Sequence, residues 1–171
     1  QITSSEYITG GLIYNRRTLN PDGELNLSGN LNQNEVIATN YISGGILNNE
    51  GSNIHSINWN DVKQNNINSQ KIITGGFIQN KLGTIDELRI NSFSDNTITS
   101  GSKIDGGLLY NDNGIINGTL EIGQITKNII NATTDYNGLI TDVAGTINAI
   151  SIDSISGNEF NANYIRGGII N

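Results

Sequence analysis

A short phrase recurs along the whole chain and constrains its fold more than any other feature. Each copy has an apolar residue, a variable residue, glycine at one or both of the next two positions, and two more apolar residues; the copies begin near 8, 42, 73, 104, 136 and 165. The central copies, from Gly45 through Gly76 and Gly107 to Gly138, are spaced by 31 residues. A fixed period of this length is typical of architectures in which each repeat stacks on the next. The sequence therefore predicts a single stacked domain over residues 1–171.

Other positions also repeat in register. One polar column has an amide in three copies and a carboxylate in the fourth, which we interpret as a side-chain ladder at a turn: Asn49, Asn80, Asn111 and Asp142. Two apolar columns are expected to line the core: Ile54, Ile85, Ile116 and Ile147, and then Ile67, Ile98, Ile129 and Phe160. A further column holds His55, Asp86, Asn117 and Asn148, and its polarity indicates that it faces water.

Local sequence favours strands and turns over helices. Apolar and polar residues alternate over 54–59 and 147–152, the pattern of a strand with one buried face. Frequent Ile and Thr, both β-branched, add to the strand preference. We expect an all-β parallel β-helix, or β-solenoid, with roughly five coils of about 31 residues. Its tight corners are expected at the repeat glycines: Gly10, Gly11, Gly44, Gly45, Gly75, Gly76, Gly106, Gly107, Gly138, Gly167 and Gly168.

The first repeat is a few residues longer than the others. The spacing from Gly11 to Gly45 is 34 residues, and the natural place for the surplus is residues 16–23, which contain the only proline. Insertions in repeat proteins map to surface loops. No capping sequence is evident at either end, so we expect that the chain either belongs to a longer solenoid or has its ends covered by identical neighbours.

Composition excludes several classes of protein. The net charge is −7 with nine Lys and Arg, whereas a nucleic-acid surface needs a basic patch. There is no cysteine to form a disulfide or a thiolate metal site. No apolar run approaches the roughly 20 residues needed to cross a bilayer, so no membrane span is expected.

Candidate catalytic residues are sparse. His55 is the only histidine, and no Ser/Asp arrangement can be placed around it. Trp59 shares an expected column with Ile90, Glu121 and Ile152, so it lies either in the core or on a surface suited to sugar stacking. Glu121 and Asp153 fall roughly one coil apart, as paired carboxylates for glycoside hydrolysis would. We predict no catalytic residues, no cofactor and no metal site, and therefore no enzyme.

The repeats resemble those of a known class of bacterial proteins. Gly75-Gly76-Phe77-Ile78-Gln79-Asn80 followed by Gly83-Thr84-Ile85, with Gly145-Thr146-Ile147 in a later copy, is similar to the passenger repeats of autotransporters and to haemagglutinin-like surface fibres. The resemblance implies an extracellular β-solenoid that is secreted or displayed on the cell surface.

The expected function is structural. The leading hypothesis is a subunit that stacks head to tail with copies of itself into an extracellular filament through backbone pairing and side-chain ladders. The alternative is a stalk or adhesin segment of a larger surface protein or a phage tail fibre, in contact with a host surface or a polysaccharide. A carbohydrate-active β-helix enzyme that uses Glu121 or Asp153 ranks below both.

Overall fold

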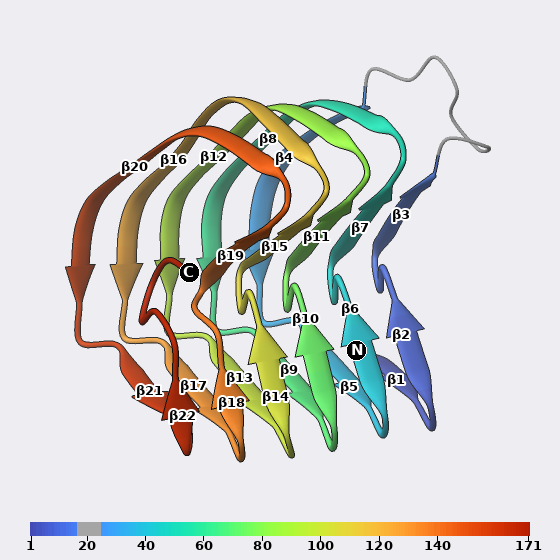
Figure 1. Cartoon of the computed structure of the whole chain (residues 1–171), viewed down its shortest axis with the longest axis vertical. Helices are drawn as coiled ribbons and strands as arrows, with labels where there is room; N and C mark the ends of the chain where they lie inside the picture. The colour runs from blue at the N-terminus through green and yellow to red at the C-terminus, as the bar shows by residue number, and fades with distance from the viewer. Residues whose placement is uncertain (17–24) are drawn as a thin grey trace.

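The computed structural model describes residues 1–16 and 25–171 and shows a β-solenoid of about five coils (Figure 1). Its strands form four parallel sheets, and each sheet takes one strand from each successive coil. No helix occurs among the described residues. The predicted fold class is confirmed. Of the expected surface loop at 16–23, only Arg16 lies within the described residues.

Each coil passes through four sheets in turn, which we call sheets A, B, C and D. Sheet A contains β1 (Ile2–Ser4), β5 (Glu35–Ala38), β9 (Asn66–Ser69), β13 (Thr97–Ser100), β17 (Ile129–Ala132) and β21 (Glu159–Asn161). Sheet B contains β2 (Tyr7–Thr9), β6 (Tyr41–Ser43), β10 (Ile72–Thr74), β14 (Lys103–Asp105), β18 (Asp135–Tyr136) and β22 (Tyr164–Ile165). Sheet C contains β3 (Ile13–Arg16), β7 (Leu47–Glu50), β11 (Ile78–Lys81), β15 (Leu109–Asp112) and β19 (Ile140–Val143). Sheet D contains β4 (Leu25–Asn32), β8 (Asn53–Lys63), β12 (Thr84–Ser94), β16 (Ile115–Thr126) and β20 (Thr146–Ser156).

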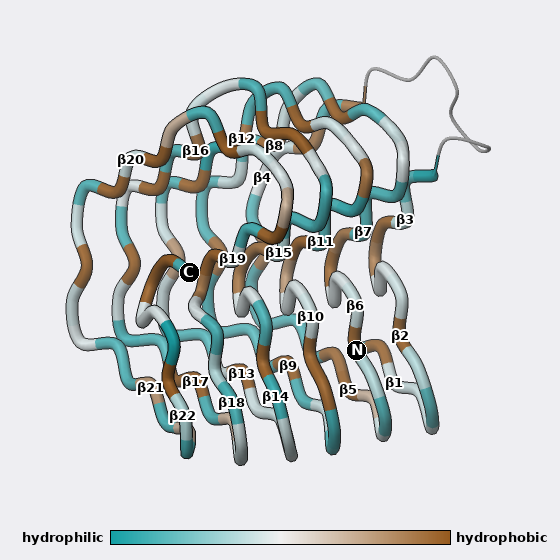
Figure 2. The backbone as a smooth tube through the Cα atoms, in the orientation of Figure 1, coloured by the Kyte–Doolittle hydropathy of each residue, from teal (hydrophilic) through white to brown (hydrophobic). Residues whose placement is uncertain are grey.

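The core is a set of apolar columns that run through the stack, visible as hydrophobic bands that recur from coil to coil (Figure 2). The first predicted column is confirmed: Ile54, Ile85 and Ile116 are fully buried and pair in register, and Ile147 continues the column in the last coil. Alternation along β9 and β13 places every second side chain inside, at Ile67, Ser69, Ile98 and Ser100. Because strands of one sheet stack directly, each buried residue contacts its counterparts in the coils on either side.

The second predicted column is wrong at one position. Ile98 pairs with Ile130, and Ile130 pairs with Phe160, whereas Ile129 pairs with Thr97 and is 40 % exposed. The cause is an irregularity in β16 after Ile116, where the register shifts against both neighbouring strands and resumes at Leu120 with β12 and at Thr119 with β20. One extra residue there displaces the rest of the coil, and a shift of one residue exchanges the two faces of a strand.

The corner between sheets B and C explains the double glycine. The first glycine of the pair has a positive φ, as at Gly44 and Gly75 (both 58°) and Gly106 (59°), a conformation that costs little only for glycine. The second glycine lies under the next coil: a Cβ added at Gly76 would overlap the carbonyl oxygen of Gly107. The fifth copy has lost one residue, so that Gly138 occupies the second position and accepts from the Gly107 N–H.

Two ladders of asparagine follow the stack. The predicted one, which we call the C–D ladder, is confirmed and begins one coil earlier, at Asn15. A second, the D–A ladder, was missed from the sequence and contains Asn34, Asn65, Asn96, Asn128 and Asn158. Three of these five, Asn65, Asn96 and Asn128, are at most 2 % exposed. Each ladder satisfies backbone groups at a turn that would otherwise be buried without a partner.

Candidate assembly interface: the two ends of the stack

The two end coils expose residues whose counterparts elsewhere are buried. Leu12 is 50 % exposed, although Ile46 and Phe77 at the same position of the next coils are fully buried. At the other end Ile165 is 49 % exposed, while Ile104 in its column is buried. These side chains are exposed because no further coil covers them. The ends therefore present core-type surface without a partner.

The same ends present strand edges. Among the described residues, β1, β2, β3 and β4 each have a partner on one side only, and so do β20, β21 and β22. The edges of sheet D are the longest, with eight residues in β4 and eleven in β20. An unpaired edge is a template for another strand. The apolar columns and the backbone edges together make each end complementary to a further coil of the same kind.

The two ends differ in shape. Sheets A and B have six strands each, whereas sheets C and D have five. A single bridge between Ile140 and Ile170 begins a further strand of sheet C. At the C-terminal end, sheets A and B therefore rise one strand above sheet D.

The C–D ladder gives each end a chemical polarity. Every amide donates toward the C-terminal end: Asn49 Nδ2 donates to Asn80 Oδ1 at 2.8 Å, and Asn80 Nδ2 donates to Asn111 Oδ1 at 2.7 Å. The last donor, Asn111, meets Asp142 Oδ1 at 2.6 Å. An ionised carboxylate only accepts, so the run of donated hydrogen bonds stops at Asp142.

The candidate catalytic residue His55 lies on a lateral face of the stack. His55 is exposed and lies 3.4 Å from Asp86, which also accepts from Asn117 Nδ2 at 2.9 Å. This confirms the predicted polar column at those positions and places it on the outer face of sheet D. The described contacts of His55 include no nucleophile.

Trp59 belongs to the core, where it is 4 % exposed and pairs with Ile90. The column continues through Ile122 and Ile152, so its predicted member Glu121 is wrong, again because of the extra residue in β16. Glu121 lies instead on the outer face beside Arg89, whose Nε is 2.7 Å from Glu121 Oε2. That hydrogen bond raises the pKa of the Arg89 guanidinium.

Glu121 and Asp153 do line one hollow, of about 150 Å³, together with Arg89, Asn91, Gly123 and Ser151. Glu121 pairs with Ser151 and not with Asp153, so the two carboxylates are not stacked in one column. Glu121 is held by Arg89, and aromatic rings are absent from the hollow's lining. The arrangement does not form the opposed pair of free carboxylates that glycoside hydrolysis requires.

Within residues 1–16 and 25–171, His, Cys, Asp and Glu do not gather in groups of three or more that would hold a metal ion. Among the same residues no helix has the length and hydropathy to span a membrane.

In comparisons with known proteins, no protein-family model matches the chain, and no curated protein or solved structure matches it significantly.

Proposed function

We propose that this protein is a structural element of an extracellular fibre and that it works by end-to-end stacking of its coils on those of identical subunits. The observation that carries the proposal is the exposure of core-type residues at both ends, Leu12 at one and Ile165 at the other, where the interior copies of the same positions are buried. Stacking buries this surface and pairs the free edges of sheets A and B.

Localisation outside the cell rests on the resemblance of the repeats to bacterial surface fibres. The described structure agrees with a load-bearing role, because consecutive coils are joined by backbone pairing in four sheets and by two ladders of amides. Stacked strands with continuous side-chain ladders give assemblies of high kinetic stability.

Electron microscopy of the purified chain across a dilution series tests the proposal. The wild-type protein is expected to form unbranched filaments whose length grows with concentration. Leu12→Lys and Ile165→Lys place a charge on opposite ends, so each should shorten or abolish the filaments. Leu82→Lys is the matched control, since Leu82 is 64 % exposed and faces solvent from a turn on the side of the stack.

Two results would refute self-stacking: wild-type particles that remain single at every concentration, or filaments that both end variants form as well as Leu82→Lys does. Circular dichroism of each variant shows whether it keeps its strand content, so a folding defect is separated from a loss of association.

The difference in strand number supports a second candidate, a stalk or adhesin segment of a longer surface protein. If a second subunit stacks on the C-terminal end, its β1 and β2 pair with sheets A and B, but no strand occupies the sixth position of sheets C and D. Further repeat coils in a longer protein supply those strands. Under this alternative, proteins lengthened by added native repeats should gain thermal stability with each coil and remain single particles, whereas a self-stacking subunit gains little.

A further inference from the structure

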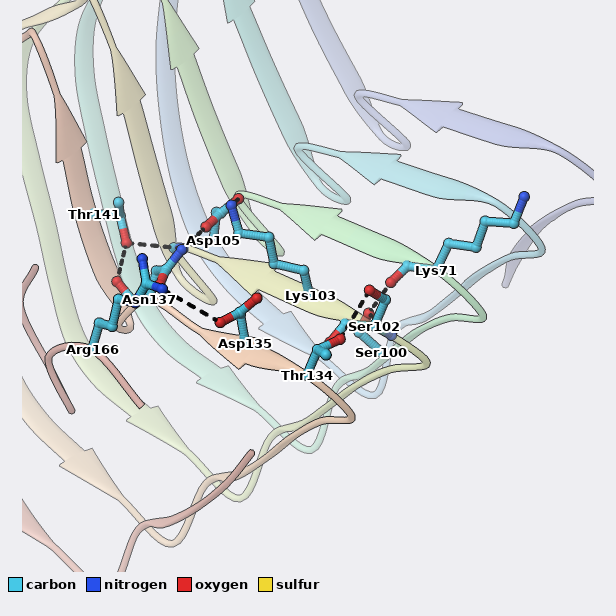
Figure 3. Close-up of polar contacts among 11 residues, drawn as sticks. Lys71, Ser100, Ser102, Lys103, Asp105, Thr134, Asp135, Asn137, Thr141 and Arg166 are labelled. Atoms are coloured by element: carbon cyan, nitrogen blue, oxygen red, sulfur yellow. Dashed lines mark hydrogen bonds and ion pairs between the residues drawn. The ribbon is translucent and has the colours of Figure 1, made fainter. Parts of the chain in front are cut away.

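The corner between sheets B and C holds three side chains of the fourth and fifth coils in an arrangement suited to covalent chemistry. Lys103 and Asp105 lie on β14, and Asn137 lies beside them on the neighbouring coil, just after β18 (Figure 3). Lys103 Nζ is 2.8 Å from Asp105 Oδ2. Asn137 Nδ2 donates to Asp105 Oδ1. One carboxylate therefore holds an amine through one oxygen and a carboxamide through the other.

Register brings the amine and the carboxamide within reach of each other. Lys103 pairs directly with Asp135, so Asn137 is its diagonal neighbour two residues further along. Diagonal neighbours lie about 7–8 Å apart on the face of a sheet, a span that a long side chain bridges. In the other described coils, the position of Lys103 is filled by tyrosine, by isoleucine at Ile72 or by aspartate at Asp135, so Lys103 is the one amine among the described residues of this column.

Burial adds to the case. The side chain of Asp105 is 12 % exposed and Asn137 is 9 % exposed, and the Oδ1 atom of Asn137 is buried without a hydrogen-bond partner. The side chain of Lys103 is 38 % exposed, and its Nζ lies against the carboxylate that can accept its proton. Once Nζ has given a proton to Asp105, the amine carries the lone pair that a nucleophile needs.

We infer that Lys103 and Asn137 form an isopeptide bond. The Nζ lone pair of Lys103 attacks the Cγ carbon of Asn137. Asp105 delivers the proton that it already holds to Nδ2 and accepts the second proton that Nζ loses. The Cγ–Nδ2 bond breaks, and ammonia leaves as the Nζ–Cγ amide forms. Reactants and products balance without an oxidant, a reductant or any other reagent.

The bond would join two consecutive coils at a corner where a hydrogen bond to a side chain replaces one to the backbone. Because the fifth copy of the repeat lacks one residue, the Gly106 N–H does not reach a backbone carbonyl and donates instead to Thr141 Oγ1 at 3.1 Å. The chain has no cysteine with which to join these coils by a disulfide. A lysine-to-asparagine bond closes the segment 103–137 and restricts the unfolded chain as a disulfide does.

Intact mass and peptide mapping test the inference on the full chain after prolonged incubation at neutral pH. The expected result is a mass lower by one ammonia and a branched tryptic peptide that joins Lys103 to Asn137, with no cleavage after Lys103. Lys103→Arg, Asp105→Ala and Asn137→Ala should each retain the full mass and lose the branched peptide. Lys71→Arg is the control, because it changes a neighbouring lysine in the turn before β10 and should cross-link as the wild type does.

Two other reactions release ammonia and are distinguished by the same experiment. Asn137 precedes Gly138 and can close on its own backbone, and the amino-terminal Gln1 can cyclise, but neither reaction uses Lys103. A mass loss that persists in Lys103→Arg, or a wild-type protein that keeps its full mass, overturns the assignment. Circular dichroism of Lys103→Arg separates the absence of the bond from a failure to fold.

Discussion

Removal of Asn96 tests whether the D–A ladder stabilises the stack. Asn96 is fully buried, and its Nδ2 donates to the Val62 carbonyl at 2.8 Å and to Asn128 Oδ1 at 3.0 Å. Its Oδ1 accepts from the backbone N–H of Asn65 at 3.1 Å and from Asn65 Nδ2 at 2.9 Å. Asn96→Ala therefore leaves one carbonyl, one backbone N–H and one amide hydrogen without partners.

The magnitude follows from those three groups. Each unpaired buried group costs about 1–3 kcal/mol, so the free energy of unfolding should fall by roughly 3–5 kcal/mol after partial relaxation. A loss of this size is exceptional for a single substitution. The control is Asn158→Ala at the C-terminal end of the same ladder. Asn158 is only half-buried, so water replaces its hydrogen bonds to Asn128 and to the Ile125 carbonyl, and the loss should stay near 1 kcal/mol.

Urea denaturation followed by circular dichroism measures both variants. Repeat arrays can lose coils one at a time, so midpoint and slope are compared as well as the extrapolated free energy. If Asn96→Ala unfolds at the same urea concentration as Asn158→Ala, the ladder does not contribute as its geometry implies, and the reasoning from buried partners fails.

Three further predictions concern the corners and the core. Gly76→Ala should lower the melting temperature strongly, because its Cβ overlaps the coil above; Gly168→Ala, at the equivalent position with its nearest atom 3.9 Å away, should change it little. Thr141→Val should cost about 1–3 kcal/mol in urea denaturation, because the Gly106 N–H loses its acceptor. Burial raises the pKa of Tyr136, so its neutral form stabilises the fold below pH about 10 and that contribution is lost as pH rises further; Tyr136→Phe should weaken this alkaline loss in a pH titration of stability.

Columns could be predicted wherever the period is constant. The Ile54 column and the C–D ladder followed directly from a spacing of 31 residues, because stacked coils repeat their chemistry position by position. The D–A ladder has the same spacing, 31 residues between Asn34, Asn65 and Asn96, and this signal was available. It was missed because asparagine is abundant at exposed positions too, so composition hid which asparagines are buried.

The residues whose burial was predicted wrongly follow a point where the repeat spacing changes. Ile129 and Glu121 both follow the extra residue in β16, and counting in steps of 31 assigned each to the wrong face. Burial of the two alternatives differs sharply, since Ile130 is fully buried. A single sequence does not reveal where a strand absorbs an extra residue, because apolar residues stand at both positions, 129 and 130.

The extra residue in β16 is compensated by the residue that the fifth copy of the repeat lacks. The spacing from Ile104 to its partner Tyr136 is 32 residues, whereas Gly107 reaches Gly138 after 31. A surplus in β16 is thus removed at the next B–C corner, and sheet C resumes its register with Leu109 paired to Ile140. The correction deprives Gly106 of a backbone acceptor and leaves Asn137 buried beside Asp105. At the corner that restores the period, a side chain therefore replaces a backbone acceptor, because the hydroxyl of Thr141 accepts the hydrogen bond that a carbonyl accepts in other coils. At the same corner Lys103 comes within reach of Asn137.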